Sequence, residues 1–170
     1  MLGFIKRNVR TSNTSTKELA YKTLVRPTAE YASSVWSPNQ KDLKYQIERV
    51  QRRAARYVTR RYEQKDSVTD MLHQLKWESL ERRRQKARLV MGYRVIHQLV
   101  QIPGEQLIPS TVCTRGNDQK FQQLPARTNY YKCSFFPSVI PLWNSLPVTI
   151  TSAGSLDDFK ARLVDAEILL

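Results

Sequence analysis

The chain has 170 residues, enough for one domain or for one domain with an appendage, and a chain of this length can bury a real hydrophobic core. Hydrophobic residues make up 41% and charged residues 25%, ordinary globular values that argue against wholesale disorder. The charge is unusual: 28 lysines and arginines against 15 acidic residues give a net charge of +13, which indicates a polyanionic partner such as nucleic acid.

The excess of positive charge lies in the first part of the chain. Residues 1–102 carry 22 basic and 9 acidic side chains, whereas residues 103–170 carry 6 of each. We therefore predict two regions, a basic helical domain at 1–102 and a charge-neutral, loop-rich segment at 103–170.

The N-terminal residues predict two short helices. The first is a basic amphipathic segment at 2–10, and small polar residues follow it. Among these, Ser15 or Thr16 can cap a second helix. That helix should end near Val25, because Pro27 disfavours helical conformation at the residue before it.

After the proline a short helix and then a long one are expected. Thr28 can cap a helix at 29–35, which a turn at 37–39 should end. The long helix at about 41–61 carries apolar residues at intervals of three and four, the spacing of one buried stripe. This stripe consists of Leu43, Ile47, Val50, Ala54 and Val58.

Two more helices are expected before residue 103. A short helix at 68–75 has Ser67 as its cap, and a second long helix runs from Ser79 to Ile102. Pro103 and Gly104 form its stop signal. Its apolar stripe consists of Leu80, Ala87, Met91, Val95, Leu99 and Ile102.

The rest of the chain lacks this long helical period. Residues 103–133 read as a loop-rich region, with short strands possible around 120–124 or 130–134. A final helix at 155–166 has Ser155 as its cap. The expected fold class is mainly α: a small helical bundle with a loop-rich C-terminal segment that ends in one or two short helices.

Two arginine-rich helix faces are the candidate binding site. At 100° per residue, the first long helix collects its arginines in a sector away from the apolar stripe. Six arginines and no acid lie between residues 49 and 61, and they repel one another unless a polyanion neutralises them. The alternative is a solvated helix face, although such faces normally mix signs. In the second cluster Arg84 falls on the apolar side and is read as structural. The predicted nucleic-acid-binding residues are Arg49, Arg52, Arg53, Arg56, Arg60, Arg82, Arg83 and Lys86.

Catalytic, metal and cofactor motifs are not found in the sequence. It has no phosphate-binding glycine loop, no GxSxG elbow and no HExxH helix. Cys113 and Cys133 lack zinc-site spacing and read as free thiols in a reducing compartment. No apolar run is long enough for a signal peptide or a membrane span. We expect no catalytic residue, no metal, no cofactor, no membrane contact and an intracellular location, nuclear or cytoplasmic.

Four ordered blocks of sequence carry a family resemblance: LGFIKRN at 2–8, AYKTLVRPTAEYASSVWSPNQKDLKYQIERVQRRAARYV at 20–58, LKWESLERRR at 75–84 and SFFPSVIPLWNSLP at 134–147. They resemble the region that follows the palm in reverse transcriptases of LINE-type (non-LTR) retrotransposons, especially Jockey-like elements. The resemblance implies a helical thumb whose arginines at 49–60 lie near the duplex of RNA template and DNA primer. The family's polymerase aspartates and its endonuclease lie upstream of this region, and no position here matches them.

Three hypotheses about function follow. The leading one is a non-catalytic, thumb-like fragment of an RNA-directed DNA polymerase that binds RNA or an RNA/DNA hybrid with little sequence specificity, and whose missing palm domain would be a partner. The second is an inert, degenerate retroelement remnant, in which Trp36, Trp143 and the pair Phe135–Phe136 would lie partly exposed. The third, an unrecognised enzyme, has the least support because the acids are scattered. As for Tyr31, Trp36, Trp77 and Trp143, aromatic residues at such positions more often belong to a core than to a base-stacking platform.

Overall fold

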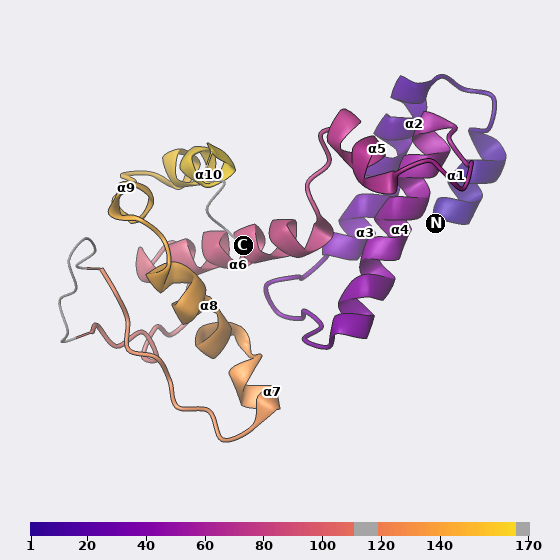
Figure 1. Cartoon of the computed structure of the whole chain (residues 1–170). Coiled ribbons are helices and arrows are strands. Elements are labelled where there is room, and N and C mark those ends of the chain that lie inside the picture. Colours follow the sequence, from indigo (N-terminus) through magenta and orange to yellow (C-terminus); the bar gives the residue numbers. More distant parts are fainter. Residues whose placement is uncertain (111–118, 166–170) are drawn as a thin grey trace. The chain divides into compact units, whose positions relative to one another are not determined.

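A computed structural model of the chain describes residues 1–110 and 119–165. The described residues are mainly helical, which confirms the expected fold class, and Figure 1 shows helices in most of the chain. They form two compact units: unit 1 consists of Met1–Ala32 and Pro38–Arg83, and unit 2 of Ser33–Ser37 and Arg84–Leu170.

The division between the two units falls within a helix of the chain and not after it. The sequence places a boundary after residue 102, where the excess of basic residues ends, whereas the units divide between Arg83 and Arg84. The difference has a physical reason, because Leu89 and Tyr93 follow that division within the same helix and pack in the core of unit 2. The excess of basic residues therefore ends after residue 102, whereas the residues begin to pack in unit 2 at Arg84.

Unit 1 is a helical cluster in which α4 is the longest helix. Its elements are α1 (Leu2–Asn8), α2 (Thr14–Ala20), the π-helical turn η1 (Tyr21–Val25), α3 (Arg26–Glu30), α4 (Lys41–Thr59) and α5 (Val68–Gln74). The observed α4 agrees closely with the predicted helix at 41–61. Ser67 accepts a hydrogen bond from the backbone N–H of Asp70 at 3.3 Å and so caps α5, as predicted.

Three predictions for the N-terminal part are wrong. The cap of α2 is Asn13, whose side chain accepts a hydrogen bond from the backbone N–H of Thr16 at 2.8 Å. Pro27 does not end a helix: it is the second residue of α3, which directly follows the π-helical turn η1. The expected helix at 29–35 does not form: α3 ends at Glu30, and Ala32 has a φ of 49°.

The core of unit 1 lies against the C-terminal half of α4. The buried residues of α4 all lie between Gln51 and Val58, so the predicted stripe is wrong at its start, where Leu43 is 43% exposed. Tyr21 from η1 donates a hydrogen bond to Oε1 of Gln51 at 3.0 Å and stacks on Trp77 with ring centroids 4.4 Å apart. The core cluster comprises Ile5, Tyr21, Val25, Ala54, Ala55, Tyr57, Val58, Met71 and Trp77. Burial of this face fixes the opposite face of α4 toward solvent.

Unit 2 is built on most of α6 and on short C-terminal helices. Its elements are α6 (Leu80–Ile96, which starts in unit 1), α7 (Asn129–Lys132), α8 (Phe135–Asn144), α9 (Val148–Thr151) and α10 (Leu156–Asp165). Trp143 and Phe159 stack with ring centroids 5.7 Å apart, and Tyr93 stacks on Phe159 at 4.5 Å. The hydroxyl of Tyr93 donates a hydrogen bond to the carbonyl of Ala153 at 2.8 Å. This aromatic cluster forms the centre of the core of unit 2.

Helix α6 is shorter than predicted, and its buried face differs. It ends at Ile96 instead of Ile102, because Gln98 adopts a left-handed conformation with a φ of 55°, which leaves Leu99 56% exposed. Leu80 and Val95 of the predicted stripe are buried, whereas Ala87 and Met91 are only half-buried. The remaining buried positions of α6 are Arg84, Arg88, Leu89, Gly92 and Tyr93.

The C-terminal segment contains one isolated β-bridge near the first of the two predicted strand positions. Pro109 pairs with Phe121 in an isolated antiparallel bridge, whereas residues 129–132 form α7 instead of a strand. Ser155 accepts a hydrogen bond from the backbone N–H of Asp158 at 3.1 Å, which confirms it as the cap of α10. The predicted end of that helix, Ala166, lies outside the described residues.

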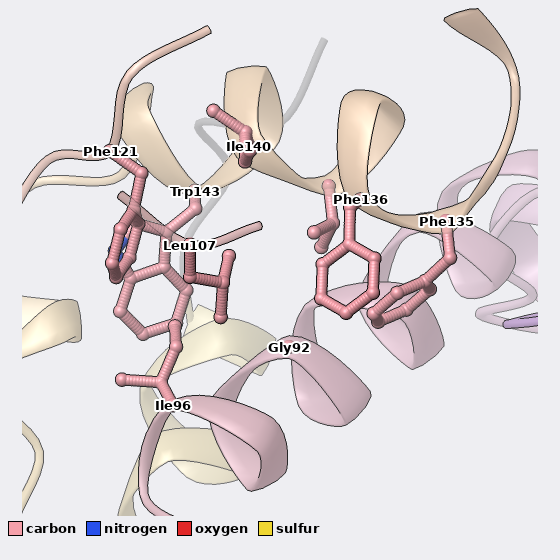
Figure 2. Close-up of a pocket in the computed structure, with 9 residues that line it drawn as sticks. Gly92, Ile96, Leu107, Phe121, Phe135, Phe136, Ile140 and Trp143 are labelled. Carbon is pink, nitrogen blue, oxygen red and sulfur yellow. The ribbon is translucent and has the colours of Figure 1, made fainter. Parts of the chain in front are cut away.

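A small apolar pocket lies between α6 and α8 in unit 2. Figure 2 shows Ile96, Leu107 and Phe136 pointing into it, with Gly92 on the backbone of α6. Its volume is about 10 Å³, no more than a single water molecule needs. The pocket is therefore a packing gap and carries no ligand site.

Gly92 allows the close approach of these two helices. A Cβ atom at this position would lie 3.1 Å from Cγ2 of Val139, tighter than ordinary van der Waals contact. Gly92→Val should therefore overpack the contact and lower the free energy of unfolding of unit 2 by about 1–3 kcal/mol. Thermal denaturation followed by near-ultraviolet circular dichroism would measure this, and an unchanged melting temperature would contradict the tight packing at Gly92.

Candidate nucleic-acid interface

Four arginines of α4 surround one open hollow on unit 1. Arg49, Arg52, Arg53 and Arg56 line it together with Val68 from the start of α5, and its volume is about 190 Å³. We call this site the arginine hollow. The arginines gather there because the opposite side of α4 is held in the core, so the spacing of three and four residues brings them to one face. The sequence predicted this gathering of the four arginines.

The arginines of the hollow are at least partly accessible to solvent. Arg49 and Arg53 are exposed, and Arg52 and Arg56 are half-buried. Arg56 donates a hydrogen bond to the carbonyl of Glu63 at 3.4 Å. In the part of the chain that the structure describes, none of the four forms an ion pair. The ion pairs of unit 1 use Lys22, Arg26, Lys44, Arg61, Lys65, Arg82 and Arg83 instead.

Glu48 directly precedes Arg49 in the sequence, but its carboxylate binds the start of α6. Its Oε2 accepts a hydrogen bond from the backbone N–H of Leu80 at 3.0 Å, at the first turn of α6. Burial raises the pKa of Glu48, and the positive charge of Arg52 acts in the opposite direction. This carboxylate therefore holds the start of α6, and it does not neutralise the hollow as a whole.

Arg60 has a structural task and does not line the hollow. It is the C-cap of α4 in a left-handed conformation, with a φ of 57° and a ψ of 24°. Its Nη2 donates a hydrogen bond to the carbonyl of Ser12 at 2.8 Å. This contact ties the end of α4 to the turn between α1 and α2. A residue 48 positions away supplies the acceptor, so helical periodicity could not reveal it.

The second predicted cluster differs from the first because its arginines are paired with acids. Arg83 donates two hydrogen bonds to the carboxylate of Glu30, one of them at 3.1 Å, and this carboxylate raises the pKa of Arg83. Arg82 pairs with Glu78 at 3.2 Å. Lys86 is half-buried and belongs to unit 2. The structure thus brings together four of the eight predicted residues and gives three others, Arg60, Arg82 and Arg83, intramolecular partners.

Two further arginines are buried in unit 2. Arg84 is only 4% exposed and stacks over the ring of Trp36 with its guanidinium carbon 4.3 Å from the centroid, which confirms the structural reading of Arg84. Arg88 donates a hydrogen bond to Ser138 at 2.9 Å, and burial lowers its pKa. Trp36 is nonetheless 43% exposed and Tyr31 is 77% exposed, so the core prediction is wrong for these two aromatics.

The described residues form neither a metal site nor a membrane span. Among residues 1–110 and 119–165, no group of three histidine, cysteine or acidic side chains lies close enough to hold a metal ion. Cys133 is a half-buried free thiol, and Cys113 lies outside the described residues. None of the described helices combines the length and the apolar character needed to cross a membrane.

Sequence reasoning missed Val68 as part of the hollow. Val68 is the first residue of α5 and is separated from Arg56 by the end of α4 and the loop that follows it, and only the packing of α5 against α4 brings it to the arginines.

Comparison of the chain with family models, curated proteins and solved structures yields no match.

Proposed function

We propose that unit 1 binds nucleic acid through the arginine hollow and that the chain catalyses no reaction by itself. The observation that carries the proposal is the set of four guanidinium groups around one hollow, without an ion-pair partner among the described residues. Such a cluster is repulsive in isolation and becomes favourable when a polyanion neutralises it.

Arginine geometry supports phosphate as the bound group. A planar guanidinium can donate two hydrogen bonds to one phosphate, and it remains charged at any physiological pH. From Arg49 to Arg56 the helix rises by roughly 10 Å, which matches about three nucleotides at 3.4 Å per strand. Contacts of this kind go to the backbone of the nucleic acid and read little sequence.

The parent protein that we propose is a LINE-type reverse transcriptase. The four blocks of resemblance support this, and so does the position of the arginine hollow within the block at 20–58. In this proposal the ligand is RNA or an RNA/DNA hybrid, a palm domain would be a partner, and the location is nuclear or cytoplasmic. The chain would then be a binding fragment of an RNA-directed DNA polymerase.

The alternative of an inert remnant loses part of its basis. It expected Trp143 to be partly exposed, but this side chain is only 1% exposed and belongs to the core of unit 2. Trp36, 43% exposed and stacked on Arg84, agrees with what this alternative expects. Phe135 and Phe136 agree with it too, since both are half-buried, and they contact each other edge to face.

The salt dependence of binding tests the proposal. Fluorescence anisotropy with a short RNA/DNA hybrid should give an affinity that falls steeply as salt rises. Four phosphate contacts predict a slope of about −3.6 in a plot of log K against log salt concentration. The proposal would be overturned by a salt-independent affinity, or by no binding at 50 mM salt or below.

A further inference from the structure

A second, larger groove adjoins the arginine hollow on unit 1. It has a volume of about 530 Å³ and lies between α1, the segment η1–α3 and α4. Arg53 lines both the groove and the arginine hollow. A ligand that places an anionic group among the arginines can therefore extend past Arg53 into the groove.

The charge of the hollow exceeds what an internal phosphate can neutralise. A phosphodiester carries one negative charge, whereas four guanidinium groups line a hollow of about 190 Å³. A phosphomonoester carries −1.5 to −2 charges at neutral pH and offers three acceptor oxygens. A terminal phosphate followed by the internal phosphates of the same strand therefore neutralises the four arginines better than internal phosphates alone.

The groove has the chemistry of a pocket for one base. Leu2, Val25 and Val50 give it apolar walls, and its lining also includes the charged side chains of Lys6 and Arg53. A base that has left its stack packs between aromatic or apolar side chains, and the energy needed to unstack it is least where it is unpaired. The terminal base of a single strand meets this condition.

We propose that the two hollows together bind the end of a nucleic-acid strand that bears a phosphomonoester, with the phosphate in the arginine hollow and the terminal base in the groove. This inference rests on the proposed function and narrows it from backbone binding in general to recognition of a strand end. The site would distinguish phosphorylated from unphosphorylated ends without reading sequence.

Matched single strands test the inference with the unmodified full chain. Four labelled 12-mers of one sequence carry a 5′-hydroxyl, a 5′-phosphate, a 3′-phosphate or a 5′-phosphate methyl ester, which has the size of the phosphate but only one charge. A phosphorylated end should bind about tenfold more tightly than the hydroxyl and the ester. Whether the 5′- or the 3′-phosphate gives the gain identifies the end that is bound.

The contribution of the groove is measured with a strand whose terminal phosphorylated residue lacks its base. Loss of the base should weaken binding about tenfold, the size of one base contact. An equal affinity of the strands with and without the base would overturn the placement of the base in the groove.

Variants locate the site without relying on overall affinity. Arg52→Ala should reduce the ratio of affinities for phosphorylated and unphosphorylated strands, whereas a merely structural change would weaken both strands alike. Arg127→Ala, which removes an exposed charge in unit 2, should leave the ratio unchanged. Equal binding of all four strands overturns this inference but leaves the proposed function standing. If neither these strands nor the RNA/DNA hybrid binds at 50 mM salt, both the inference and the proposed function are overturned.

Discussion

Reversing three charges in the arginine hollow should lower nucleic-acid affinity about a thousandfold at 0.1 M salt. The variant Arg52→Glu, Arg53→Glu, Arg56→Glu removes three charged hydrogen-bond donors, each worth at least 1.5 kcal/mol. It should also flatten the salt slope by roughly 2.7, which corresponds to three phosphate contacts. The side chains are exposed or half-buried, so the buried face of α4 is unchanged. Anisotropy titrations across a range of salt concentrations measure both effects.

A variant with the same net charge change elsewhere serves as the control. Arg10→Glu, Lys41→Glu, Lys65→Glu alters three exposed residues of unit 1 that do not line the hollow. It should lose only the affinity that arises from long-range attraction, which is small at 0.1 M salt because the screening length is about 10 Å. If the control loses as much affinity as the hollow variant, binding depends on overall charge and not on the hollow.

Helical periodicity predicted the arginine hollow because one long helix supplies all four of its arginines. The spacing of apolar residues in α4 set which side is buried, and the arginines then had to lie elsewhere. The same reasoning misjudged Leu43, since the helices that cover α4 contact its C-terminal half. An apolar stripe shows which face of a helix can be buried, but the helices that pack against that face determine how much of its length is covered.

The second cluster shows what periodicity cannot predict. Arg83 looks available in sequence, but its partner Glu30 lies 53 positions earlier. Arg88 is buried because Ser138, 50 positions later, offers an acceptor in α8. Long-range pairing of this kind changes an arginine from a possible phosphate ligand into a structural residue, and single-sequence patterns contain no signal for it.

The N-terminal errors have a local cause. Pro27 predicts the end of a helix near Val25, whereas the helical backbone continues through it. The π-helical turn η1 comes directly before α3, in which Pro27 is the second residue. No sequence pattern marks the π-helical turn η1. The continuation of the helix through Pro27 could therefore not be predicted from the sequence.

Trp143→Ala should have the largest effect on stability, a loss of about 3–5 kcal/mol from the free energy of unfolding of unit 2. The side chain is 1% exposed, stacks with Phe159 and lies 6.3 Å from Phe121 between ring centroids. Its indole N–H donates a hydrogen bond to the carbonyl of Gln119 at 2.9 Å, and truncation also removes this bond. Hydrogen exchange should show lost protection in α8 and α10.

Trp36→Ala is the matched control for this change. It removes the same indole from a position that is 43% exposed, where the contact with Arg84 is worth about 0.5–1 kcal/mol. Exchange in α4 should remain slow in both variants, since the core of unit 1 contains neither tryptophan. If Trp143→Ala destabilised the protein no more than Trp36→Ala, the aromatic cluster would not be the centre of unit 2. If it instead exposed the amides of α4 to exchange, the two units would unfold together, and the arginine hollow would depend on the core of unit 2 for its geometry.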